Sequence, residues 1–277
     1  MKHFEKTITI QKEKIYTQSW SPEEPPRALL FVLHGVAEHS GRYLHVAEKL
    51  VSQGIAVYTM DLPGHGKSSG KRAYIKSFDY AVGIVDYQIR KMKLEFPATP
   101  AFFLGHSMGG SLAVFYALKL SPALEGFILT SSALKISSDI SPLLVKLSGF
   151  FSLIAPKMPV LKLDSQGLSR DPKVIREYNS DPLNFLGKLP VRTGAEINRS
   201  ISFTMENAGR FNYPVLILHG SEDKLADYRG SETFFQKISS KDKEMKIFDS
   251  LYHELLNEYE KEEIIGLISH WILKRAR

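Results

Sequence analysis

Short apolar segments that end abruptly in glycine-rich or polar turns recur along the chain. The segments expected as strands are 28–33, 55–60, 101–104, 126–130, 215–218 and 245–248. Continuous apolar runs of this kind are typical of parallel strands whose two faces are both covered by helices. Helical periodicity occupies the intervening stretches 43–52, 78–96, 111–120 and 262–274. Strands that alternate with helices predict an α/β fold with a mostly parallel central sheet flanked by helices.

Two parts of the chain depart from this pattern. The first twenty residues alternate between apolar and polar positions, as an antiparallel hairpin at the sheet edge would. From 137 to 206 no buried strand is evident, and apolar helical pieces and Asp-Pro turns dominate. We therefore expect a core formed by 1–136 and 207–277, interrupted by a helical cap at 137–206.

The first helical piece of the predicted cap is apolar on more than one face. Its apolar residues are Leu143, Leu144, Val145, Leu147, Phe150, Phe151, Leu153 and Ile154. Packing against a single core would leave part of this segment exposed, a surface suited to covering a ligand tunnel or touching a membrane. The alternative is an ordinary helix that is fully packed against its neighbours.

Composition narrows the classes of protein. The chain has 277 residues, of which 43% are hydrophobic and 24% charged, as expected for one globular domain with an insertion. It has no cysteine, which excludes disulfides, a thiolate nucleophile and a cysteine zinc site. The net charge of +6 comes from charges spread along the chain, so we expect no nucleic-acid binding. With no signal peptide and no apolar run of about 20 residues, we expect a cytoplasmic protein.

The sharpest local signal is the G-x-S-x-G sequence at 105–109, which follows a predicted strand and precedes a predicted helix. This context exposes a nucleophilic serine above the sheet, so we predict Ser107 as the nucleophile. The same pattern recurs at 66–70, but there a Pro-Gly loop separates it from the strand and no helix follows directly. We interpret Ser68 as a loop residue.

A serine hydroxyl needs a base, and the base needs an orienting carboxylate. Asp223 follows the strand predicted at 215–218, at the edge where catalytic residues of such sheets lie. We predict it as the acid, with Glu222 and Asp227 as competitors. His253 follows the last predicted strand and is the predicted base.

Attack on a carbonyl creates an oxyanion that preorganised amides must stabilise. The Met108 amide and the Val36 amide, the latter in the loop after the first buried strand, are the natural donors. In the same loop, His34, Glu38 and His39 do not form a His-Glu-x-x-His zinc motif. We therefore expect no metal and no cofactor.

Together these motifs resemble the monoglyceride lipase and lysophospholipase-like serine hydrolases, which are grouped with the serine aminopeptidase-type α/β-hydrolases. The likeness is carried by 34–43 (HGVAEHSGRY), 61–68 (DLPGHGKS), 105–110 (GHSMGG), 178–183 (YNSDPL), 220–223 (GSED) and 252–253 (YH). The resemblance implies the triad and oxyanion hole above. It also implies that Glu38 and Arg42 form a polar network supporting the oxyanion loop, and that a lipophilic cap lies over an acyl tunnel.

The expected activity is therefore hydrolysis of a lipid-like monoester, a monoacylglycerol, to fatty acid and glycerol through an acyl-enzyme. A lysophospholipase or a short-chain carboxylesterase is the near alternative, and a catalytically silent binding scaffold is the alternative of another class. We further expect transient contact of 143–154 with a membrane surface, helped by the nearby Lys135, Lys146 and Lys157.

Overall fold

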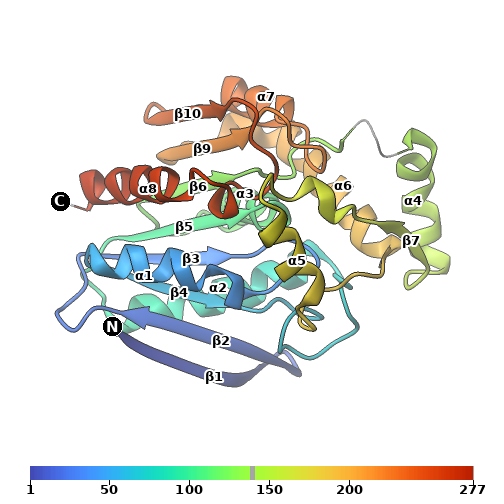
Figure 1. The fold of residues 1–277 in the computed structure, drawn as a ribbon. Helices are drawn as coiled ribbons and strands as arrows, with labels where there is room; N and C mark the ends of the chain where they lie inside the picture. The colour runs from blue at the N-terminus through green and yellow to red at the C-terminus, as the bar shows by residue number, and fades with distance from the viewer. Residues whose placement is uncertain (138–140, 277) are drawn as a thin grey trace.

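An eight-stranded sheet forms the centre of the molecule (Figure 1). This computed structural model describes residues 1–137 and 141–276, apart from the side chains of Pro142 and Leu144. The strands are β1 (Lys2–Ile10), β2 (Glu13–Ser21), β3 (Ala28–Leu33), β4 (Ile55–Met60), β5 (Ala101–His106), β6 (Gly126–Thr130), β9 (Val215–Gly220) and β10 (Lys243–Phe248). They lie in the order β1-β2-β4-β3-β5-β6-β9-β10, and β3, β4, β5, β6, β9 and β10 are parallel. The predicted α/β fold is confirmed.

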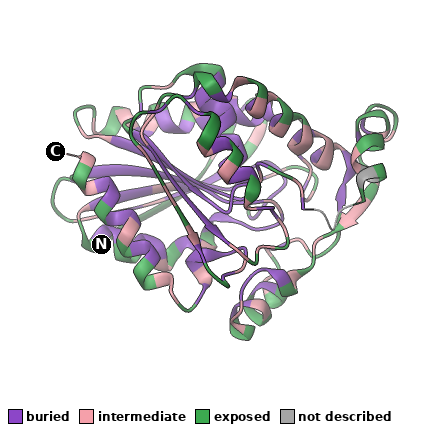
Figure 2. Cartoon of the chain, turned by 90° about the horizontal axis from the view of Figure 1, so that it is seen from above, coloured by how far each residue is buried: buried purple, intermediate pink, exposed green. Residues whose placement is uncertain are grey.

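Helices cover both faces of this sheet, which explains the continuous apolar runs. Side chains of β3 alternate: Leu29, Phe31 and Leu33 join one core cluster, whereas the intervening residues join another. The first cluster lies under α2 (Phe78–Glu95), α3 (Met108–Leu120) and α7 (Arg229–Lys237). The second lies under α1 (Leu44–Ser52) and α8 (Lys261–Arg275). Figure 2 shows the buried strands between these two helical layers.

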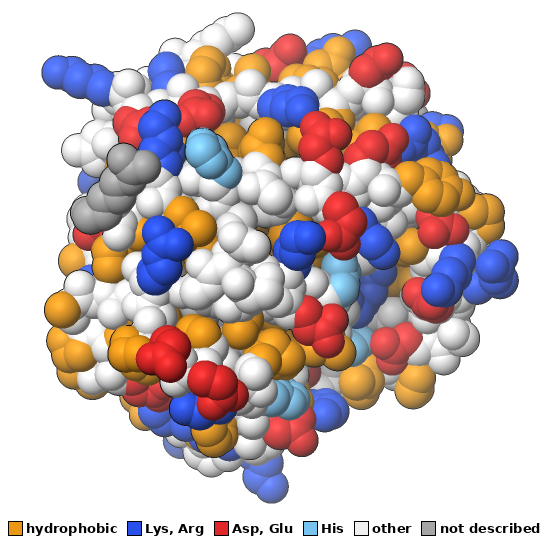
Figure 3. All heavy atoms as spheres, turned by 60° about the vertical axis from the view of Figure 1, so that its left-hand side comes forward, with side chains coloured by type: hydrophobic (Ala, Val, Ile, Leu, Met, Phe, Trp, Pro, Cys, Tyr) orange, Lys and Arg blue, Asp and Glu red, His pale blue; other side chains and the backbone are white. Residues whose placement is uncertain are grey.

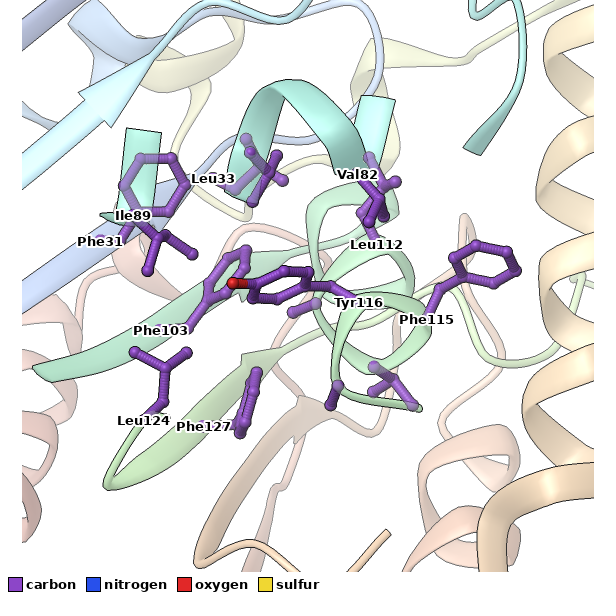
Figure 4. Packing of buried hydrophobic residues seen from close by; sticks show 14 of the residues in the cluster. Phe31, Leu33, Val82, Ile89, Phe103, Leu112, Phe115, Tyr116, Leu124 and Phe127 are labelled. Carbon is purple, nitrogen blue, oxygen red and sulfur yellow. The ribbon is translucent and has the colours of Figure 1, made fainter. Parts of the chain in front are cut away.

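Aromatic rings fill much of the first cluster. The rings of Phe103 and Tyr116 are 6.0 Å apart, and Phe127 stacks on Phe103 at 5.9 Å (Figure 4). The Tyr116 hydroxyl reaches past the cluster to donate to Asp86 at 2.9 Å, so its polar end has a partner. These contacts fix α3, which carries the predicted nucleophile at its amino end, against β5.

The amino-terminal hairpin forms as predicted. β1 pairs with β2 in an antiparallel ladder that runs from Lys2–Ser21 to Ile10–Glu13, and β2 pairs antiparallel with β4. β1 lies at one edge of the sheet, and most of its residues are exposed on both faces. By contrast, α3 begins at Met108, earlier than the 111–120 pattern predicts, because two glycines in its first turn hide the helical periodicity.

In the described part of the predicted cap, three α-helices, a short 3-10 helix at Ser165–Gly167 and a small sheet form. Its helices are α4 (Pro142–Ile154), α5 (Pro172–Ser180) and α6 (Val191–Asn207). The strands β7 (Pro159–Lys162) and β8 (Lys188–Pro190) pair antiparallel and were not predicted, because they are short and β7 has no buried residue. Apart from α6, which also packs on α3, these elements lie beyond the carboxyl ends of the parallel strands (Figure 1).

The surface charges are not segregated by sign, as the evenly spread charges of the sequence predict. The face around α8, away from α4, carries acidic and basic side chains interspersed with one another (Figure 3). Among the described residues, no helix combines the length and the apolar character that crossing a membrane requires.

Candidate active site

Ser107 occupies a strained turn between β5 and α3. Its backbone has φ 53° and ψ −119°, a region that residues other than glycine rarely adopt. The turn is held because the Ser107 amide donates to Thr130 O at 3.0 Å and the Ala133 amide donates to Ser107 O at 3.1 Å. Strain of this kind costs about 1–3 kcal/mol and is tolerated when the surroundings fix the conformation.

The glycines on either side of this turn allow close backbone approach. A Cβ on Gly105 would collide with the backbone of Gly109, and a Cβ on Gly109 would collide with Leu33 O in β3. Packing therefore requires glycine at both ends of the G-x-S-x-G sequence. The turn presents Ser107 to a cavity at the carboxyl end of the sheet.

Asp223 and His253 meet across two loops. His253 Nδ1 lies 2.7 Å from Asp223 Oδ2, and the Asp223 side chain is fully buried. Asp223 Oδ1 accepts the amides of Leu225 and Ala226 at 2.8 and 3.0 Å, which fixes the carboxylate. Because Nδ1 is engaged with the carboxylate, Nε2 is the nitrogen available to the cavity, which His253 and Ser107 both line.

The electrostatics of this pair suit an ion pair. Burial opposes ionisation of Asp223, but the charge of His253 and the hydrogen bonds from two histidines outweigh it and hold the pKa of Asp223 well below its ordinary value. Burial lowers the pKa of His253, yet the charge and hydrogen bond of Asp223 raise it above the ordinary value of 6.5. His253 is therefore a stronger base than a free imidazole.

A neighbouring histidine has the opposite character. The rings of His106 and His253 lie 4.8 Å apart, but burial and the nearby His253 lower the pKa of His106 to about 4. His106 Nδ1 lies 3.2 Å from Thr130 Oγ1 within the core. At neutral pH His106 is uncharged, so its ring does not compete with His253 for a proton.

The two competing carboxylates point elsewhere. Glu222 is exposed, and Asp227 forms an ion pair with Lys135 at 2.7 Å. The structure instead brings in a residue that the sequence reasoning missed: His219 Nε2 lies 3.0 Å from Asp223 Oδ2 and 3.1 Å from Ala226 O. Both neighbours are acceptors, so Nε2 carries the proton, and Asp223 accepts from two imidazoles.

Glu38 shapes the loop after β3, which is the predicted oxyanion loop. Its Oε1 accepts the Gly35 amide at 2.7 Å and the Tyr43 hydroxyl at 3.0 Å, which closes the turn that carries Val36. Val36 and Met108 both line the cavity beside Ser107. Met108 is the first residue of α3, where an amide has no acceptor within the helix and is free to donate to a ligand.

Arg42 joins this loop to the loop of the base. Its guanidinium donates to Glu38 Oε2 at 2.9 Å and to both oxygens of Glu254 at 2.5 and 2.7 Å. Burial opposes the charge on Glu38, but Arg42 and the nearby histidines lower its pKa to about 2. Burial also opposes the charge on Arg42, and Glu254 and Glu38 nevertheless raise its pKa. Glu254, which follows His253, was not singled out from the sequence.

The predicted cap contacts both loops through backbone hydrogen bonds. Ala37 has φ 67°, and its carbonyl accepts the Tyr178 hydroxyl at 3.1 Å and the Phe185 amide at 2.9 Å. The Glu254 amide donates to Leu168 O at 2.7 Å. Leu168, Tyr178 and Phe185 of the predicted cap therefore hold the loop that carries Val36 and the loop that carries His253.

A cavity of about 220 Å³ opens above these groups. Most of its lining from the predicted cap is aliphatic or aromatic: Val145, Val160, Leu161, Leu163, Leu168, Phe185, Leu186, Leu189, Val191, Ile197 and Ile201. A mostly apolar cavity that is also lined by Ser107, His253 and the residues of the two predicted oxyanion amides suits an ester with a long apolar acyl group. Within the described residues, no group of three or more His, Asp or Glu side chains is arranged to hold a metal ion.

Comparison with known proteins agrees with this geometry. The family model described as serine aminopeptidase, S33, matches residues 24–260. A monoacylglycerol lipase of Mycolicibacterium smegmatis is 32% identical, over 94% of this chain and 93% of that protein. Human monoglyceride lipase is 31% identical, over 97% and 90%. The crystal structure of a monoacylglycerol lipase from Paleococcus ferrophilus superposes with a TM-score of 0.87 at 31% identity, covering 94% of this chain and 99% of that one.

These matches span nearly the whole chain rather than isolated motifs. They confirm the resemblance that the motifs indicate and the predicted class, a carboxylic ester hydrolase. The chain belongs to the serine aminopeptidase, S33, family of α/β-hydrolases.

Proposed function

We propose that the protein hydrolyses long-chain monoacylglycerols to a fatty acid and glycerol. The observation that carries this proposal is the aliphatic cavity of about 220 Å³ that meets Ser107 and His253. The relatives that act on monoacylglycerols by name support the head group.

In the proposed mechanism, Ser107 Oγ attacks the ester carbonyl while His253 Nε2 takes the serine proton. Asp223 orients the imidazole and stabilises its positive charge, which fits the 2.7 Å contact and the raised pKa of His253. His253 then gives the proton to the leaving glycerol oxygen, and the acyl group stays on Ser107. Water attacks the acyl-enzyme with His253 again as the base, which releases the fatty acid and restores Ser107.

The Val36 and Met108 amides are the proposed donors to the oxyanion. Glu38 and Arg42 act on them indirectly, because they hold the loop that carries Val36. Removing one such donor in other enzymes costs about 10²–10³ in kcat, so the precision of this loop matters for the rate.

A panel of esters tests the proposal. Purified protein is given monoacylglycerols, lysophosphatidylcholines and 4-nitrophenyl esters, each with butyryl, octanoyl, lauroyl and oleoyl chains. The proposal expects the highest kcat/KM for a long-chain monoacylglycerol. Preference for the lysolipids would make the protein a lysophospholipase, preference for butyryl esters a general carboxylesterase, and no turnover of any ester a binding scaffold.

We propose further that residues 137–206 form a cap domain whose α4 touches lipid. One apolar stripe of this helix is exposed to solvent. Leu143, Phe150 and Leu153 are 64, 60 and 74% exposed, and Leu147 lies between them. On other faces of α4, Val145 and Ser148 line the cavity. An exposed apolar stripe beside an acyl cavity is suited to taking a poorly soluble ester directly from a lipid surface. Exposed Lys146 lies in α4 and exposed Lys157 follows it closely in the chain, whereas Lys135 is paired with Asp227.

Serine substitutions on this stripe test the contact. Phe150→Ser with Leu153→Ser should weaken sedimentation with phosphatidylcholine–phosphatidylglycerol vesicles by at least about tenfold, because two apolar side chains are withdrawn from lipid. Turnover of vesicle-borne monooleoylglycerol should fall with it, whereas turnover of soluble 4-nitrophenyl butyrate should not. The matched control is Leu94→Ser with Leu120→Ser, two exposed leucines on α2 and the end of α3. Equal losses on both substrates would reject the lipid contact.

A further inference from the structure

One face of α6 lines the cavity above Ser107. Val191, Gly194, Ile197 and Ile201 all border the cavity, and their spacing of three and four residues places them on one stripe of the helix. At a rise of 1.5 Å per residue this stripe is about 15 Å long. Val145 and Ser148 of α4, which packs against α6, line the same space.

Gly194 is the member of this stripe without a side chain. Glycine is unfavourable in the interior of a helix, and it is commonly found there because a neighbour approaches closely or the backbone has a positive φ. Gly194 is not among the residues with positive φ. Beyond its chain neighbours and its own helix backbone, a Cβ at Gly194 would meet no atom of the described residues within 4 Å.

Gly35, which also lines the cavity, shows the contrast. A Cβ there would lie 3.0 Å from Glu38 Oε1 and 3.1 Å from Ser107 Cβ, so packing restricts that position. Among the residues that the structure describes, none places such a packing demand on Gly194. The space that its missing side chain leaves belongs to the cavity.

We propose that Gly194 sets the length of the acyl chain that the cavity accepts. The inference rests on the proposed function in one respect, that the acyl group of the ester occupies this cavity. A leucine at this position adds four carbon atoms on the cavity side of α6, in a space of only about 220 Å³. It therefore takes the place of about four acyl methylenes, each of which contributes about fourfold to kcat/KM when buried.

Chain-length profiles of Gly194→Ala and Gly194→Leu test this inference. With 4-nitrophenyl esters from butyryl to oleoyl, Gly194→Leu should leave the butyryl ester within about twofold of wild type and lower kcat/KM for the oleoyl ester by about 250-fold. Gly194→Ala should lower the oleoyl value by about fourfold. The control is Gly266→Leu on α8. A Cβ at Gly266 also meets no described atom within 4 Å, but Gly266 does not line the cavity, so the chain-length profile of this variant should match wild type.

Several outcomes overturn the inference. A profile unchanged by Gly194→Leu would mean that the chain does not pass this face of α6, and an equal loss at every length would mean that Gly194 affects the site as a whole. Thermal denaturation checks the fold, and if the leucine variant is unstable the alanine profile decides. Because the aryl ester series needs no glycerol head group, failure of wild type on monoacylglycerols alone would reject the proposed substrate and leave the test of Gly194 standing.

Discussion

Removing the Arg42 guanidinium should destabilise the protein severely, because two buried carboxylates depend on it. Glu38 and Glu254 are 5 and 3% exposed, and Arg42 lies 2.9 Å from the first and 2.5 Å from the second. Arg42→Met keeps most of the side-chain length and removes the charge. Breaking a buried ion pair from one side typically costs about 3–5 kcal/mol, which lowers the Tm of a chain of this size by roughly 10 °C.

The pH dependence of the stability loss in Arg42→Met shows whether the unpaired Glu38 carboxylate causes it. In wild type the pKa of Glu38 is lowered from 4.5 to about 2, so its contribution to stability is present above pH 4.5 and is lost only as the pH falls toward 2. In Arg42→Met the effect of burial is less opposed, and the pKa of Glu38 rises. The folded variant then prefers the protonated carboxyl, so its deficit in stability should be largest near pH 8 and smaller near pH 5.

Urea denaturation at pH 5 and pH 8 measures this difference. The control is Arg90→Met, which removes an exposed arginine paired with Asp86 at 2.7 Å. Exposed pairs of this kind contribute about 0.3–0.5 kcal/mol, so the control should stay near wild type at both pH values. If Arg42→Met is as stable as Arg90→Met, or if its loss of stability is the same at both pH values, Arg42 does not stabilise the fold by neutralising buried Glu38.

Three further predictions concern the pair of Asp223 and His253. Asp223→Asn should lower kcat by about 10⁴ while Asp227→Asn stays near wild type in the same ester assay, and the reverse result would identify Asp227 as the acid. Because His253 must be neutral to accept a proton and its pKa is raised, kcat/KM should decline with falling pH from above pH 6.5; a midpoint below 6.5 would contradict the contact with Asp223. His219→Leu removes one hydrogen-bond donor from Asp223 Oδ2, so the carboxylate interacts more strongly with His253 and the midpoint of the pH profile should move to higher pH. His219→Gln retains a donor and should leave the midpoint unchanged; equal shifts in both variants would mean that this hydrogen bond is unimportant.

Most of the sheet was predictable, because burial between two helical layers imposes uninterrupted apolar runs. The strand before Ser107 and the strand before Asp223 carry this signal. The strand before His253, β10, lies at the sheet edge, and its exposed Glu244 and Lys246 interrupt the apolar residues. The expected positions of these side chains at the carboxyl edge of a parallel sheet then bring them to one place. The antiparallel pair β7 and β8 carries no such signal, since short strands outside a core need no apolar run.

The contacts that were missed involve groups with little sequence signature. Ala37 O accepts hydrogen bonds from the predicted cap, and any residue type has a carbonyl there. His219 lies inside a strand, where the sequence alone indicates only an ordinary core residue. Its 3.0 Å distance to Asp223 is visible only in the structure. Gly194 could be seen in the sequence, but only the empty space beside it distinguishes it from a glycine needed for helix packing.

Labelling with an alkyl fluorophosphonate, followed by peptide mass spectrometry, tests whether Ser107 is the nucleophile of an ester hydrolase. Wild type should carry one phosphonate on the peptide that contains Ser107, and labelling should abolish hydrolysis of monooleoylglycerol. Ser107→Ala should take no label, lose hydrolysis and keep the thermal stability of the wild type, since only the nucleophilic oxygen is removed. A label that persists in Ser107→Ala, or monooleoylglycerol hydrolysis that survives the substitution, would show that Ser107 is not the nucleophile.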